Sequence, residues 1–184
     1  WLGGVFLFGG GSVLQWYQIR CRVREAVSDG EAFLCDSISS PFVFGLFRPR
    51  MYLPYGLSDE ERTYVLLHEK QHIRRGDVWL KPLFWLAVVI YWMHPLVWLA
   101  WHFYSKDLEL ACDECAVQSL DAKEKQSYGR TIVRLAVQPK ETLRPVAFGT
   151  SPTKERVQHL FSHRPLAFGI TVAAVAAIGV SIVF

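Results

Sequence analysis

The sequence contains an H-E-x-x-H pattern at His68, Glu69 and His72. On a helix, residues four positions apart share a face, so both imidazoles can bind one metal ion, and Glu69 can reach a metal-bound water. The flanking sequence predicts such a helix. Ser58 and Glu61 have the spacing of a capping box, and neither Pro nor Gly follows until Gly76. This segment therefore predicts a helical metal site.

A catalytic zinc site usually has three protein ligands and a water, so two histidines are not enough. The side chains that could supply the third ligand lie downstream: His94, His102, Glu109, Asp113 and the Cys112/Cys115 pair. The C-x-x-C pair has neither a second pair nor a thioredoxin-like context, which disfavours a structural zinc or redox role. Glu109 and Asp113 are four residues apart and share a helix face.

Charged residues are strongly segregated along the chain. All 20 Lys and Arg and all 17 Asp and Glu lie in 20–81 and 106–164. Long apolar stretches between charged ones are typical of a membrane protein. We therefore expect a mainly α integral membrane fold, with transmembrane helices at 1–19 and 165–184. Buried core helices are the alternative for both stretches.

The residues between these stretches, 20–164, are expected to form one domain that faces the cytoplasm. Arg20, Arg22 and Arg24 follow the first stretch directly, and basic residues mark the cytoplasmic side of a span. The apolar stretch 82–105 contains His94-Pro95 at its centre, which predicts a helical hairpin that either dips into the membrane or packs as core helices. Short apolar runs between 25 and 54 predict a small β-sheet.

Several functions are disfavoured by composition. A formal net charge of +3 is too small and too evenly spread to predict direct nucleic-acid binding. A transporter or channel would need polar groups in its spans, and 1–19 and 165–184 contain no charged residue. The glycines of the first stretch suggest helix–helix contact, within the chain or in a homodimer.

Four segments in order carry a resemblance to a known family. They are 40–54, from Ser40 to Pro54; 67–77, with the H-E-x-x-H pattern and Arg75-Gly76-Asp77; His94-Pro95-Leu96; and 109–114, from Glu109 to Glu114. The chain here closely resembles the antirepressor metallopeptidases, membrane zinc peptidases related to the β-lactam-sensing signal transducers of bacteria. A weaker similarity lies around Lys154–Val157.

The resemblance implies a zincin-like (gluzincin) core with one Zn²⁺ per chain. Carried over by position, His68, His72 and Glu109 would be the metal ligands, Glu69 the general base and Asp113 a residue that orients a ligand. The donor for the developing oxyanion stays open among His102, Arg156 and Tyr128.

The resemblance also implies location and partners. The protein is expected in the bacterial cytoplasmic membrane, in contact with the lipid bilayer. It is expected to be the protease module of a signal-transducing, antirepressor-type receptor and to hydrolyse peptide bonds at the cytoplasmic face. The substrate would be a protein or peptide, either a transcriptional repressor or the chain itself. The alternatives are a housekeeping membrane protease of the prenyl-protease type and an inactive zinc-containing signalling scaffold.

Overall fold

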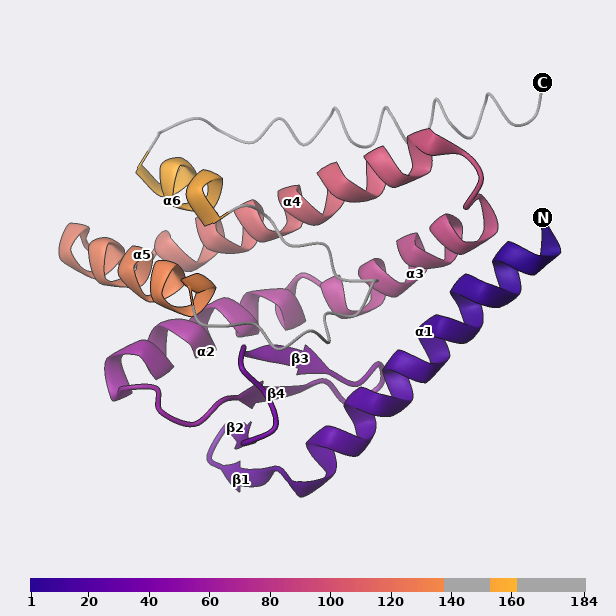
Figure 1. Ribbon diagram of the computed structural model, residues 1–184. Coiled ribbons are helices and arrows are strands. Elements are labelled where there is room, and N and C mark those ends of the chain that lie inside the picture. The colour runs from indigo at the N-terminus through magenta and orange to yellow at the C-terminus, as the bar shows by residue number, and fades with distance from the viewer. Residues whose placement is uncertain (138–152, 162–184) are drawn as a thin grey trace.

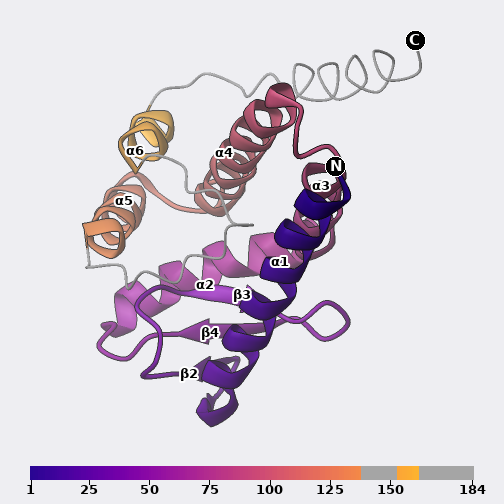
Figure 2. The same ribbon diagram turned by 45° about the vertical axis from the view of Figure 1, so that its right-hand side comes forward.

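The computed structural model describes residues 1–137 and 153–161, which form a small sheet and a set of helices (Figures 1 and 2). The helices are α1 (Leu2–Arg22), α2 (Asp59–Arg74), α3 (Asp77–Ile90), α4 (Pro95–Val117), α5 (Ala122–Val137) and α6 (Thr153–Phe161), with a short 3₁₀ turn at Val23–Glu25. The strands are β1 (Val27–Asp29), β2 (Ala32–Leu34), β3 (Phe42–Phe44) and β4 (Arg50–Leu53).

The sheet has the order β1-β2-β4-β3. The pairs β1–β2 and β3–β4 are antiparallel, whereas β2 and β4 are parallel. Gly45 follows β3 with φ +111°, and a Cβ there would lie 2.6 Å from the carbonyl oxygen of Arg48. The return from β3 to β4 therefore requires glycine.

Helix α2 lies at the centre, between the sheet and α4 (Figures 1 and 2). One of its faces packs on the sheet, where Val65 meets Ala32, Met51 and Leu53. Another face packs on α4 and α5 through a cluster whose buried members are Tyr64, Ala116, Val117, Tyr128 and Ile132. The predicted capping box is confirmed, because the Ser58 and Glu61 side chains cap each other's backbone N–H groups.

The prediction of an integral membrane fold is wrong for the part of the chain that the structure describes. In residues 1–137 and 153–161, no helix combines the length and apolar character of a membrane span. Helix α1 has the length, but five glycines, two glutamines and a serine lower its hydropathy. The apolar stretch 82–105 is divided between α3 and α4, and α4 continues into charged residues. The predicted span at 165–184 lies outside the described residues.

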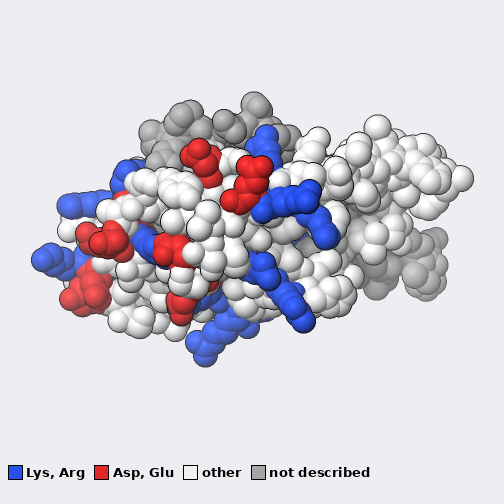
Figure 3. Space-filling model, turned by 90° about the horizontal axis from the view of Figure 1, so that it is seen from below, with Lys and Arg blue, Asp and Glu red and all other residues white. Residues whose placement is uncertain are grey.

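Charged side chains are also segregated in space. Seen from the sheet side, they cover one end of the molecule, while the end formed by the start of α1 and the α3–α4 turn carries uncharged side chains (Figure 3). Apolar side chains are exposed along α1, among them Phe6, Leu7 and Val13. The side of α1 that faces α3 contributes Val5 and Phe8 to a cluster with Trp85 and Val89 of α3 and Trp101 of α4.

Gly4 of α1 lies against Trp92 in the α3–α4 turn. A Cβ on Gly4 would lie 2.0 Å from the ring of Trp92, which donates a hydrogen bond to the carbonyl oxygen of Trp1 and packs on Phe8. Gly10, on the same helix, has open space at this position.

We therefore expect Gly4→Ala to lower the free energy of unfolding by about 1–3 kcal/mol relative to Gly10→Ala, because the Trp92 ring must move. Gly10→Ala should be neutral or stabilising by about 0.5–1 kcal/mol, the helix-propensity gain of alanine. Urea unfolding of both variants measures the difference. Equal stability would show that α1 does not pack on Trp92 as described.

Candidate metal centre

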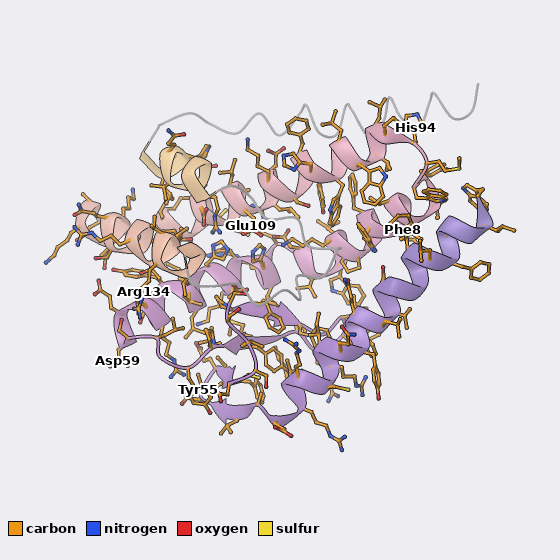
Figure 4. All side chains as sticks on the ribbon, viewed as in Figure 1. Phe8, Tyr55, Asp59, His94, Glu109 and Arg134 are labelled. Atoms are coloured by element: carbon orange, nitrogen blue, oxygen red, sulfur yellow. The ribbon has the colours of Figure 1, made fainter. Side chains whose placement is uncertain are left out.

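The candidate centre lies where α2 faces α4. His68 and His72 lie one helical turn apart on α2, and their rings meet edge-to-face with centroids 4.9 Å apart. Glu109 approaches from α4, near the middle of the molecule (Figure 4). The ligand atoms of these three side chains all lie within 4.8 Å of one another, so this group could hold a metal ion.

The distances within this group suit zinc. Nε2 of His68 lies 3.5 Å from Oε2 of Glu109, and Nε2 of His72 lies 3.6 Å from Oε1. With metal–ligand bonds of about 2.0–2.1 Å, two ligands of a tetrahedral zinc lie roughly 3.3–3.5 Å apart. The donor set of two imidazoles and one carboxylate is also that of known catalytic zinc sites.

The opposite nitrogen of each histidine lies against a carboxylate. Nδ1 of His68 is 3.0 Å from Oδ1 of Asp113, and Nδ1 of His72 is 2.8 Å from Oδ2 of Asp77. An Nδ1–H that donates to a carboxylate fixes the tautomer, leaves the Nε2 lone pair for a metal and increases its basicity. Both histidines are therefore oriented with Nε2 toward Glu109.

Asp77 holds this place because of the turn at Gly76. Helix α2 ends at Arg74, and Gly76 then adopts φ +75°, so that α3 begins with Asp77 directed back at His72. Asp77 is 1% exposed. In the sequence, its position five residues after His72 is the only sign of this contact.

Residues from α5 and α6 fix Asp113. The hydroxyl of Tyr128 donates to Oδ1 at 2.7 Å, and Arg156 donates to Oδ1 and Oδ2, each at 2.7 Å. Tyr128 also contacts His68 directly, with its oxygen 2.9 Å from Nδ1. Asp113 is fully buried, which would by itself raise its pKa, but Arg156 and His68 hold that pKa below its ordinary range.

Lys81 is a member of the site that the sequence does not reveal. In the sequence it is visible only as the charge that bounds the apolar stretch 82–105. In the structure its ammonium donates to Oε1 of Glu109 at 3.1 Å. Burial alone would lower the pKa of Lys81, but the carboxylates of Glu109, Asp77 and Glu69 raise it, so the side chain is charged. Burial alone would raise the pKa of Glu109, but Lys81 and His72 hold it well below its ordinary value.

The remaining candidates are placed as follows. Glu69 is buried beside His68 in α2. His102 is exposed on α4, where its ring contacts Phe103, and it is not part of the cluster. His94 lies at the far end of α4 from Glu109 (Figure 4).

Cys112 belongs to a second group of potential ligands, with His72 and Asp77. Its Sγ lies 3.2 Å from Nδ1 of His72 and donates to Asp77 at 3.3 Å. Burial, reinforced by Asp77, raises the pKa of Cys112 far above its ordinary value, so Cys112 is a thiol in the metal-free protein. The 2.8 Å between His72 and Asp77 is a hydrogen-bond distance, shorter than the separation of two zinc ligands. The group of His72, Asp77 and Cys112 therefore orients His72 for the group that His72 forms with His68 and Glu109.

Comparison with known proteins assigns the family. The family model for the BlaR1 peptidase M56 matches residues 15–160, so the chain belongs to this family of metallopeptidases. The methicillin resistance mecR1 protein of Staphylococcus aureus is 27% identical over 133 residues, which cover 67% of this chain and 23% of that protein. The regulatory protein BlaR1 of Bacillus licheniformis is 35% identical over 100 residues, 53% of this chain and 17% of that protein. The chain thus spans less than a quarter of the length of these relatives. The resemblance inferred from the sequence is confirmed.

Removal of the Asp77 carboxylate should weaken metal binding while the ligands remain. We expect Asp77→Asn to lower zinc affinity about 10–100-fold, because His72 loses the charged acceptor that orients it. Asp36→Asn, which neutralises an exposed carboxylate in a turn, is the matched control and should bind zinc as the wild type does. Competition with a chromophoric chelator measures both. An unchanged affinity in Asp77→Asn would mean that His72 needs no such partner.

The metal-free protein should lose stability as the pH rises. Burial alone would lower the pKa of His68, but hydrogen bonds with Asp113 and Glu109 raise it from 6.5 to about 9. Protonated His68 therefore stabilises the fold fully below pH 6.5, and this contribution is lost as the pH rises through about 9. Urea midpoints in the presence of a chelator should fall across this range.

With saturating zinc this fall should disappear, because a metal ion binds the neutral imidazole. Asp113→Asn, measured without metal, should flatten the same pH dependence, since it removes the main partner of the protonated ring. A fall of equal size in that variant would assign the effect to another group.

Proposed function

We propose that this chain is a zinc endopeptidase in which His68, His72 and Glu109 bind the metal and Glu69 is the general base. The observation that carries the proposal is the orientation of the two imidazoles. Each Nε2 lies within 3.6 Å of the Glu109 carboxylate, and each Nδ1 lies within 3.0 Å of another carboxylate. The family assignment supports the same class of chemistry.

A bound zinc ion would supply a water of lowered pKa and polarise the carbonyl of the scissile peptide bond. The chain's own groups then handle the protons. The Glu69 carboxylate accepts a proton from the attacking water as the new C–O bond forms, and returns it to the amine nitrogen as the C–N bond breaks. Burial of Glu69 favours this transfer, because little water competes for its carboxylate.

Two of the residues considered as oxyanion donors have another task in this proposal. Tyr128 and Arg156 hold Asp113 and so orient His68. An oxyanion donor among His102, Arg156 and Tyr128 stays a prediction.

The substrate is proposed to be a protein segment in extended conformation. In the described sheet β3 is an edge strand that pairs with β4 on one side and contacts α2. An extended peptide that pairs with such an edge gains backbone hydrogen bonds and is held in register beside the metal helix. A regulatory role, with a transcriptional repressor as the natural substrate, is consistent with the description of the Bacillus relative as a regulatory protein.

The test is Glu69→Gln, which is nearly isosteric but cannot accept the proton. We expect zinc content and the unfolding midpoint to match the wild type, while cleavage of a fluorogenic casein or peptide mixture falls by at least about 10²–10⁴-fold, the usual contribution of a general base. His68→Ala should lose both metal and cleavage.

Glu124→Gln, at the exposed start of α5, is the matched control and should cleave normally. Cleavage by Glu69→Gln at the wild-type rate would refute the assignment of the base. Zinc binding without cleavage in the wild type would favour an inactive signalling scaffold.

A further inference from the structure

The two oxygens of the Glu109 carboxylate have different surroundings. Oε1 accepts a hydrogen bond from the Lys81 ammonium at 3.1 Å and lies 3.6 Å from Nε2 of His72. Oε2 lies 3.5 Å from Nε2 of His68 and 3.6 Å from a guanidinium nitrogen of Arg156, a longer separation than a hydrogen bond. A charged donor is therefore bound to one oxygen only.

Each oxygen nevertheless faces one imidazole. A carboxylate placed in this way, with one edge toward both ligand nitrogens, could bind a metal ion through both oxygens. In that mode the metal would have four ligand atoms from the protein, two imidazole nitrogens and two carboxylate oxygens. Catalytic zinc sites instead keep three protein ligands and leave a position for water or substrate.

The position of Lys81 determines whether Glu109 can bind a metal through one oxygen or through both. Lys81 lies one turn into α3, whose first residue, Asp77, is bound to His72. Its side chain is only 16% exposed, so the ammonium has little access to bulk water as an alternative partner to Glu109. A cation on Oε1 withdraws electron density from that oxygen and obstructs the approach of a second cation to it.

We propose that Lys81 is a positioning residue that keeps Oε1 of Glu109 occupied, so that Glu109 binds the metal through Oε2 alone. The site then retains an open position for the water that Glu69 deprotonates. This inference rests on the proposed function, since it assumes that Glu109 is a ligand. It gives α3 two roles in the site, through Asp77 on one ligand and through Lys81 on another.

The wild-type protein provides the first test. The metal-free chain is loaded with Co²⁺, which takes the geometry of zinc and reports its coordination number, and is studied by visible and X-ray absorption. We expect four-coordinate cobalt with one carboxylate oxygen at bonding distance. Bidentate coordination by Glu109 in the wild type would overturn the proposal without any variant.

The second test is Lys81→Met, which keeps the length of the side chain and removes the donor. We expect Glu109 to bind through both oxygens, so that cobalt becomes five-coordinate and its visible absorption weaker. Zinc affinity should be unchanged or higher, and cleavage should fall about 10–100-fold. Lys81→Gln retains an N–H donor for Oε1 and should restore the four-coordinate spectrum and much of the activity. Lys123→Met, which removes an exposed lysine of α5, should match the wild type throughout.

The outcomes separate this inference from the proposed function. If Lys81→Met has the wild-type spectrum and activity, or if it loses zinc, Lys81 does not set the binding mode and the inference fails while the zinc site stands. If Glu109→Ala binds zinc as tightly as the wild type does, Glu109 is no ligand and the proposed function fails as well. Circular dichroism of each variant establishes that it is folded, and the wild-type spectrum decides the binding mode should Lys81→Met not fold.

Discussion

The structure depends on one requirement of histidine chemistry. Two imidazoles on one face of α2 can serve a single metal ion only if both rings direct Nε2 to the same point, and each ring then has an Nδ1 that needs an acceptor. Neither acceptor comes from α2 itself. Asp77 meets this need from the first residue of α3, and Asp113 meets it from α4, one turn after Glu109. The turn at Gly76 and the packing of α4 across α2 bring these two carboxylates to the histidines.

Such a site concentrates charge where little water reaches it. Buried carboxylates are tolerated only when cations and hydrogen-bond donors surround them. Here Asp113 has Tyr128 and a bidentate Arg156, Asp77 has His72 and a more distant Arg75, and Glu109 has Lys81. Each cation comes from a segment other than that of its carboxylate, so the charge pairs also join α3, α4 and α6 to one another. Polar pairing and helix packing thus stabilise the same junction.

The sequence predicts what depends on local spacing. The i, i+4 pairs of α2 and α4, the capping box and the short strands are all local patterns, and the structure contains them. For Asp77 the sequence offers one sign, the spacing of five residues from His72, and for the contact of Lys81 with Glu109 it offers none. Both contacts depend on a left-handed glycine and on how α3 packs on α4. The predicted span at 1–19 failed for a different reason. The absence of charge suggested a membrane helix, but in α1 glycine and glutamine take the place of larger apolar side chains, and the helix packs on the protein through Gly4 and Phe8.

Arg156 determines how much of the chain a complete centre requires. The other side chains of the centre lie between residues 68 and 128, whereas this guanidinium lies on α6, and the family match also extends to residue 160. A fragment that ended with α5 would still contain every proposed ligand, but its buried Asp113 would have no arginine opposite it. The C-terminal limit of the complete centre is therefore set by the arginine that pairs with Asp113 and not by the last ligand. Boundaries drawn from the H-E-x-x-H segment and Glu109 alone would leave that centre incomplete.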